Sequence, residues 1–133
     1  MAEVFTVRAF IKGVDLTPRK VKIVADLVRN RTVADAVVIL EHTPRRSALA
    51  VKKAIQSAAA NATNNHGLDA KTLHISKLSV TAGPRLRRFK PHMRGIALPF
   101  EKKSSHILVE VSGAVKAKKK PAVVAETNKE ETK

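Results

Sequence analysis

The hydrophobic pattern first predicts a strand at residues 5–12. Apolar side chains occupy every second position there, at Phe5, Val7, Ala9 and Ile11. This period of two is typical of a strand that turns one face toward a core. Gly13 and Asp15 then break the alternation, and we expect them to end the strand.

Helical spacing replaces the alternation in the next two segments. Thr17 and Pro18 suit the N-cap and the first position of a helix. Asn30 suits the left-handed conformation at the end of that helix. Thr32 is expected to cap a second, short helix, whose apolar residues are Val33, Ala36, Val37 and Leu40.

Thr43 and Pro44 are expected to open a third and longer helix. Its apolar residues recur every three or four positions, at Ala48, Val51, Ile55, Ala58 and Ala62. The small side chains in this stripe predict that another element packs closely against it. The run from Asn64 to Gly67 is expected to end the helix.

Two further strands are predicted on either side of a basic segment. In the first of them, at 73–80, the apolar positions change face between Ile75 and Leu78. Such a change predicts a bulge near Lys77. The second strand is predicted by the alternation of Ile107, Val109 and Val111, and residues 112–113 close the folded part.

The order of these elements predicts an α+β fold, in which three helices pack on a small antiparallel three-stranded sheet that carries a long extended β-hairpin arm. We expect one domain over residues 1–113, with the arm at about 80–105. Residues 114–133 are low in complexity, basic first and acidic last. They are expected to form a disordered charged tail.

The segment from Gly83 to Lys103, which we call the arm, holds seven cations and one acid, Glu101. Its prolines would stiffen it, and its glycines would permit tight bends. About ten residues on each side would reach roughly 35 Å. The alternative is a mobile, solvated loop. Phe89 and Phe100 favour an ordered element, because a free linker does not need apolar contacts.

The composition indicates a polyanionic partner. The 133 residues carry a net charge of +15, with a pI of about 10.7. Nucleic acid is the commonest partner of so basic a protein, and an acidic membrane surface is the second. There are four phenylalanines and no tyrosine or tryptophan. This scarcity argues against a module that stacks bases on an aromatic sheet, and favours binding through charge and shape.

Both threonine–proline helix starts are followed by two cations, Arg19 and Lys20 in one case and Arg45 and Arg46 in the other. Cations there oppose the helix dipole, by a few tenths to ~1 kcal/mol each. When a phosphate binds there, the same cations become favourable, because cations and free N–H groups then converge on one anion. The alternative is that these are ordinary surface residues behind a threonine cap.

The sequence offers little for catalysis or metal binding. Cysteine is absent, which fits a reducing compartment. Between Glu41 and Glu101 the only acid is Asp69, and no histidine has metal-ligand spacing with a carboxylate. We expect no catalytic residue, cofactor or metal, so the protein is predicted not to be an enzyme. Neither a secretory signal nor a membrane span is predicted.

Several segments, in this order and spacing, resemble the large-subunit ribosomal protein twenty-two family. They are Thr17–Val21, Val24–Arg29, Val51–Lys53, Ser57–Ala62, Gly83-Pro84 with Arg87-Arg88 and Pro91, Arg94-Gly95, and Lys102–Ile107. The resemblance implies binding to large-subunit ribosomal RNA across several RNA domains and a role in early subunit assembly. It also implies that the tip of the hairpin lies at the constriction of the peptide exit tunnel.

The resemblance extends to partners and residues. It implies neighbouring ribosomal proteins at the tunnel, possible contact with the nascent peptide, a cytoplasmic ribosome, and neither membrane nor DNA. The residues expected at the tunnel tip are Arg87, Arg88, Phe89, Lys90, Pro91, His92, Met93 and Arg94. The residues expected to bind RNA are Arg19, Lys20, Arg45, Arg46, Lys52, Lys53, Arg85, Arg87, Arg88, Lys90, Arg94, Lys102 and Lys103.

This chain departs from the family pattern at Ile96–Phe100, where the returning side of the arm is apolar. We therefore expect the outgoing side and the tip to make most phosphate contacts. The returning side would pack against bases, sugars or a neighbouring protein. The second hypothesis is a free-standing module that binds nucleic acid or a membrane surface outside any assembly, and an enzyme is the third.

Overall fold

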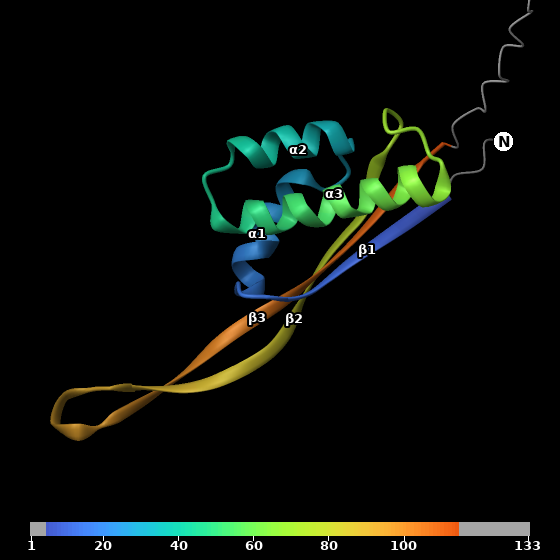
Figure 1. The fold of residues 1–133 in the computed structure, drawn as a ribbon. Coiled ribbons are helices and arrows are strands. Elements are labelled where there is room, and N and C mark those ends of the chain that lie inside the picture. Colours follow the sequence, from blue (N-terminus) through green and yellow to red (C-terminus); the bar gives the residue numbers. More distant parts are fainter. Residues whose placement is uncertain (1–4, 115–133) are drawn as a thin grey trace, which may run out of the picture.

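The computed structural model describes residues 5–114 (Figure 1), so the predicted tail lies outside the described residues except for Ala114. The elements in chain order are β1 (Phe5–Val14), α1 (Pro18–Val28), α2 (Val33–His42), α3 (Arg46–His66), β2 (His74–Pro91), the 3-10 turn η1 (Met93–Gly95) and β3 (Ala97–Gly113). The strands form one antiparallel sheet in the order β1-β3-β2. The predicted α+β fold is therefore confirmed.

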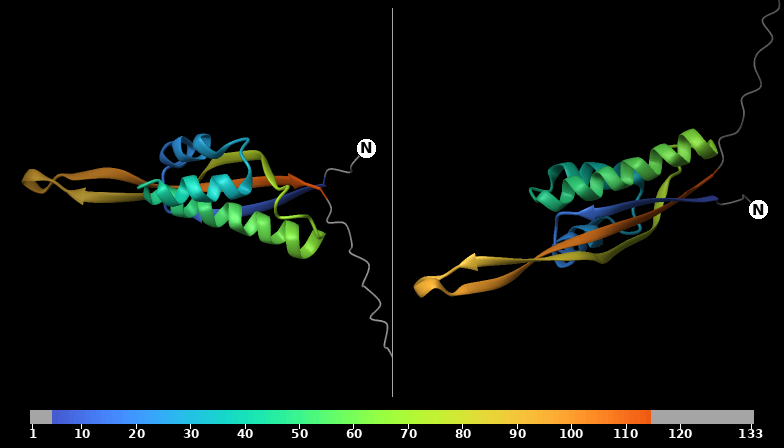
Figure 2. Two further views of the ribbon diagram at one scale, coloured as in Figure 1. Left: turned by 90° about the horizontal axis from the view of Figure 1, so that it is seen from above. Right: turned by 60° about the horizontal axis from the view of Figure 1, so that its bottom comes forward.

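All three helices lie on one face of the sheet (Figure 2). The central strand shows this in its burial, because Ile107, Val109 and Val111 are fully buried while the residues between them are partly accessible. The long helix α3 turns Val51 and Ile55 into the same core. The buried alanines of α3 leave room for close contact with the sheet, as the sequence predicted.

The helix ends follow the sequence signals in most places. Thr17 is the N-cap of α1 and Pro18 its first residue, and Asn30 has a φ of 60° beyond the end of that helix. The hydroxyl of Thr32 accepts a hydrogen bond from the backbone N–H of Asp35, at 3.2 Å, and so caps α2. Gly67 ends α3 in the left-handed conformation.

The predicted start of the third helix is wrong. Thr43 is the C-cap of α2, and α3 begins at Arg46 with Arg45 as its N-cap. The physical reason is that the Thr43 hydroxyl donates to the carbonyl of Ile39, at 2.7 Å, and so bonds to the preceding helix. Arg45 and Arg46 still lie at the start of α3, but the two helix starts differ in their capping.

The strand β1 also differs from the prediction, because it does not end at Gly13. It continues to Val14 through a register shift between Ile11 and Val14. Gly13 adopts a φ of 68°, and its N–H donates to Nδ1 of His106 at 2.9 Å. The glycine is therefore part of a bulge, which glycine accommodates without steric cost.

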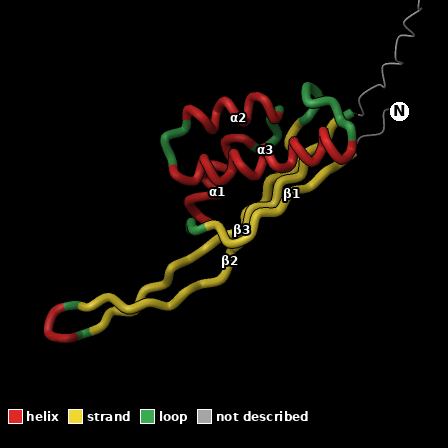
Figure 3. Tube along the Cα trace, in the orientation of Figure 1, coloured by secondary structure: helices red, strands yellow, loops and turns green. Residues whose placement is uncertain are grey.

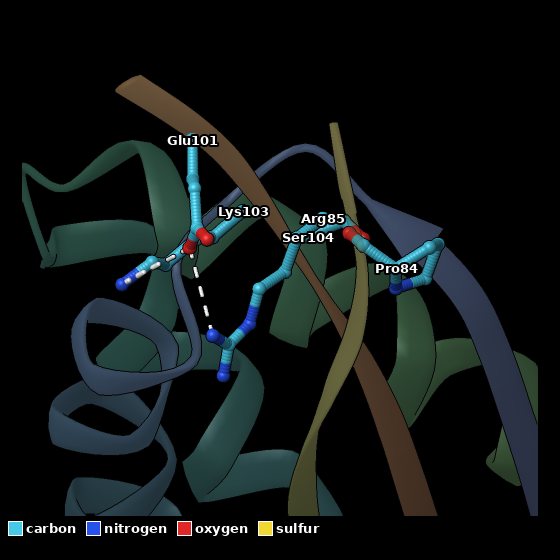
Figure 4. A network of polar contacts seen from close by, with 5 residues as sticks. All are labelled: Pro84, Arg85, Glu101, Lys103 and Ser104. Atoms are coloured by element: carbon cyan, nitrogen blue, oxygen red, sulfur yellow. Dashed lines mark hydrogen bonds and ion pairs between the residues drawn. The ribbon is translucent and has the colours of Figure 1, made fainter. Parts of the chain in front are cut away.

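The strand β2 contains two irregularities. The first lies between Ile75 and Lys77, which confirms the predicted bulge, and the second lies between Ala82 and Arg85. At the second, the hydroxyl of Ser104 donates to the carbonyl of Pro84 at 2.7 Å (Figure 4). A Cβ on Gly83 would lie 2.6 Å from that hydroxyl oxygen, so a larger residue would displace the serine.

Candidate nucleic-acid interface

Beyond the second irregularity, β2 and β3 leave the helices and continue as a two-stranded ribbon (Figure 3). The ribbon is paired from Arg85 opposite Lys103 to Pro91 opposite Ala97, which spans about 20 Å. Every residue from 84 to 103 is exposed. The predicted hairpin arm is therefore present, and it has no core of its own. A ribbon of this kind is marginally stable in water and is suited to being stabilised by what surrounds it.

The turn of the hairpin is shorter than the predicted tip, because residues 87–91 belong to β2. It is closed by a hydrogen bond of 2.8 Å from the N–H of His92 to the carbonyl of Ile96. Arg94 adopts a φ of 56°, which disfavours an arginine by roughly 1 kcal/mol. Arg94 therefore carries its positive charge at the far end of the arm on a strained backbone.

Cations and apolar side chains share a face of the ribbon. Arg88 lies opposite Phe100, and Lys90 lies opposite Leu98. Paired residues of an antiparallel ladder point to the same side. The Nζ atom of Lys90 is 5.0 Å from the centroid of the Phe100 ring. The apolar return therefore supplies surface beside the cations of the outgoing strand, an arrangement suited to a phosphate next to a base or sugar.

Near the base of the arm, carboxylates already balance several of the predicted RNA-binding cations. Glu101 lies 3.5 Å from Arg85 and 3.9 Å from Lys103 (Figure 4). Lys102 lies 2.9 Å from Asp15, at the end of β1. All of these groups are accessible to solvent, where such pairs contribute little to stability. A phosphate can therefore replace either carboxylate as the partner of its cation.

Two hydrogen-bonded lysines lower the pKa of their acidic partners. The ammonium group of Lys102 donates to Asp15 and holds the pKa of that carboxyl below its usual value, through the hydrogen bond and then through its charge. Lys52 acts in the same way on Glu41, at 2.8 Å, and lowers its pKa. Lys52 is thus bound to an acid that is 11 residues away in the chain.

The other predicted contact residues are exposed and form no ion pair with any residue in 5–114. They are Arg19, Lys20, Arg45, Arg46, Lys53, Arg87, Arg88, Lys90 and Arg94. Four of them lie on the outer arm, where Glu101 is the nearest acid along the ribbon. The outer arm therefore presents an excess of positive charge, since Glu101, opposite Arg87, is the one acid within residues 84–103.

The fold brings the first helix start and the base of the arm together. A hollow of about 420 Å³ is lined by Thr17 and Arg19 from the start of α1 and by Arg85 and Lys103 from the arm. The hydroxyl of Thr17 makes no capping hydrogen bond, and the first turn of α1 contains no acid. Cations from two segments thus line one hollow beside a helix start, and the sequence alone did not predict this pairing.

The second helix start borders a different hollow. Arg46 and Lys53 of α3 lie beside Asp15 at the end of β1, around a space of about 310 Å³. Arg46 contributes through its charge to the lowered pKa of Asp15. The two helix starts that the sequence treated as equivalent are therefore in different surroundings: the first shares its hollow with residues of the arm, and the second is linked to the arm through Asp15.

Over residues 5–114, no group of three or more histidine, cysteine or acidic side chains is placed to hold a metal ion. Within the same residues, no helix is long and apolar enough to cross a membrane.

These features define a class of protein, namely small basic α+β proteins that present an exposed hairpin to a polyanion. The sequence model of the ribosomal protein L22p/L17e family matches residues 9–112, and the chain belongs to that family. It is therefore a ribosomal protein of the large subunit that binds ribosomal RNA beside other ribosomal proteins, in a family of structural components of translation. The resemblance drawn from the sequence is confirmed.

Proposed function

We propose that the arm lies in the wall of the peptide exit tunnel, with its tip, residues 87–94, at the constriction, while the domain binds ribosomal RNA through its helix starts. The observation that carries this proposal is the outer arm itself. It is a ribbon two strands wide, exposed on every side, whose cations Arg88, Lys90 and Arg94 pair with no described acid, while Glu101 lies opposite Arg87. Such a shape fits between RNA segments, where phosphates supply the missing charge.

The same proposal covers assembly and surroundings. The domain would bind the folding RNA first, since its shape does not depend on a partner, and the arm would order as RNA closes around it. The arm would then contact neighbouring ribosomal proteins at the tunnel and, at its turn, the nascent peptide. We propose the cytoplasm as the site of this assembly.

Photo-crosslinking in translating ribosomes tests the position of the turn. A photoreactive residue would replace Met93 in the turn, and a matched variant would carry it at Asn65, exposed at the far end of α3. We expect Met93 to crosslink to nascent chains stalled in the tunnel and Asn65 not to do so. Crosslinks to nascent chains from position 65 alone would contradict the tunnel placement.

Sedimentation tests the binding of the domain to the large subunit. The protein should co-migrate with large subunits and remain there after a wash at moderate salt, because several phosphate contacts must be broken together. A variant lacking residues 85–103 should still enter the particle but leave it at lower salt. Loss of this variant from all particles would show that the domain does not bind by itself.

A further inference from the structure

The sheet has a second face, which no helix covers in the described structure (Figure 2). Phe10 of β1 lies on this face opposite Leu108 of β3, and His106 is on the same side. Phe10 is 49% exposed, while His106 and Leu108 are half-buried. A large aromatic ring is therefore exposed to solvent beside a second ring, on a face of the sheet that does not contribute to the core.

The two rings are held in a defined arrangement. The centroids of Phe10 and His106 are 5.8 Å apart, with an interplanar angle of 62°. Nδ1 of His106 accepts the N–H of Gly13 at 2.9 Å, which fixes the orientation of the imidazole. The imidazole beside Phe10 therefore loses little conformational freedom when a ligand binds there.

The charge around Phe10 indicates which ligand fits. The Nζ atom of Lys12 lies 5.6 Å from the centroid of the Phe10 ring. Neither Lys12 nor Arg8 forms an ion pair with any described residue, and the one ion pair of this face joins Lys77 to Glu110 at 3.9 Å. An aromatic ring among cations suits a nucleotide, because the base is flat and its phosphate is negative.

We propose that the open sheet face binds an unpaired nucleotide of ribosomal RNA, with the base stacked on Phe10 beside His106 and its phosphate on Lys12. The proposal rests on the RNA partner of the proposed function, but it uses a face of the domain that is separate from the arm. It also adds base stacking to the sequence expectation of binding mainly through charge and shape. One aromatic pair, assembled from residues 96 positions apart, provides the stacking surface.

The natural chain has no tryptophan, so a Phe10→Trp variant reports on this face without background. Stacking of a base on the indole should quench its fluorescence when purified large-subunit RNA is added to the full-length protein. A Phe89→Trp variant, on the arm, is the matched probe for the proposed function. We expect quenching at both positions, with that at position 10 also produced by an unstructured oligoadenylate.

A Phe10→Leu variant separates stacking from simple apolar contact. Leucine preserves apolar surface but offers no π-face, so affinity for the RNA should fall by about fivefold or more. Because the position is half exposed, the variant should keep its fold, and a thermal melt compares its stability with that of the natural protein. Unchanged RNA affinity in Phe10→Leu would overturn the proposal.

The outcomes distinguish the two proposals. Quenching at position 89 with none at position 10 would overturn the stacking site and leave the arm in contact with RNA. No RNA binding by any variant would overturn both. A blue shift at position 10 without quenching, seen only in whole subunits, would mean that a neighbouring protein covers this face, and it would overturn the stacking site.

Discussion

The inner and outer parts of the long hairpin use the same two strands but are stabilised in different ways. Where β2 and β3 underlie the helices, Ile75, Ile107 and Val109 are fully buried. From residue 84 to residue 103 the same ladder continues with every side chain exposed. Hydrogen bonding between strands is common to both parts, so burial is what differs. The inner part therefore folds through its own core, and the outer part depends on its surroundings.

The two parts also differ in how their charge is balanced. At the base of the arm, Glu101 and Asp15 lie within 4 Å of three cations. Beyond Glu101 the outer arm has no acid at all. The base of the arm can thus be positioned before any partner binds, while the outer arm carries unneutralised charge to the partner.

The largest expected effect concerns burial. Ile55→Ala, at a fully buried position of α3, should lower the free energy of unfolding by about 2–5 kcal/mol. Leu98→Ala, at a position of the arm that is 47% exposed, should change it by less than about 0.5 kcal/mol. Urea denaturation measures both. Equal losses would mean that the arm belongs to the cooperative core.

The next effect concerns unbalanced charge. Replacing Arg87 and Arg88 together by alanine should reduce the slope of log K against log salt by about one to two units for binding to large-subunit RNA. Lys52→Ala is the control within the domain, because Lys52 already bonds to Glu41, and its effect should be smaller. A slope unchanged in the double variant would mean that the outer arm does not contact RNA.

A smaller effect is expected at the turn, where strain and function oppose each other. Arg94→Gly should stabilise the turn by about 1 kcal/mol, since glycine adopts a φ near 56° without steric cost. Amide exchange at His92, whose N–H closes the turn, should slow down. Arg88→Gly, at an extended position, should have the opposite effect. Faster exchange at His92 in Arg94→Gly would show that the arginine side chain stabilises the turn.

The smallest effect concerns the link between the domain and the arm. The pKa of Asp15 is lowered in the folded protein, so the contribution of its bond to Lys102 is present above the unfolded pKa and is lost as pH falls through the lowered value. In an NMR titration, Lys102→Ala should return the pKa of Asp15 toward its ordinary value. Glu41, which pairs with Lys52, should titrate as before. A titration of Asp15 that the substitution leaves unchanged would exclude Lys102 as the cause.

The sequence predicted those features that depend on neighbouring residues. The change of apolar face between Ile75 and Leu78 was enough to indicate the first bulge, because the period of a strand is local. The start of α3 was missed because Thr43 had two possible partners, and only the packed structure shows that it bonds back to Ile39. The local signal was correct about a helix end but ambiguous about which helix.

The site was less predictable because its partners are far apart in the chain. The sequence identified Lys52 and Lys102 as cations, but it could not show that Glu41 and Asp15 lie against them. It also could not place His106 beside Phe10, since the pairing of β1 with β3 joins the two ends of the folded chain. The net charge of the sequence was therefore enough to predict a polyanionic partner. Which cations are already paired with a carboxylate could be seen only in the folded structure.

The two irregularities of β2 shift the alternation of its side chains between the two sides of the sheet. Each adds one residue to β2 relative to β3, at Ser76 and at Gly83-Pro84, so the two shifts cancel in parity. Deleting one residue at either place would remove that irregularity and leave Arg87 and Arg88 on their present sides, because β3 is continuous and the outer pairs stay the same. Removing one residue from each strand near the turn would instead shorten the ribbon by about 3.3 Å and leave the sides of the remaining residues unchanged. The reach of the hairpin can therefore change while the direction of its side chains is kept by their pairing with β3.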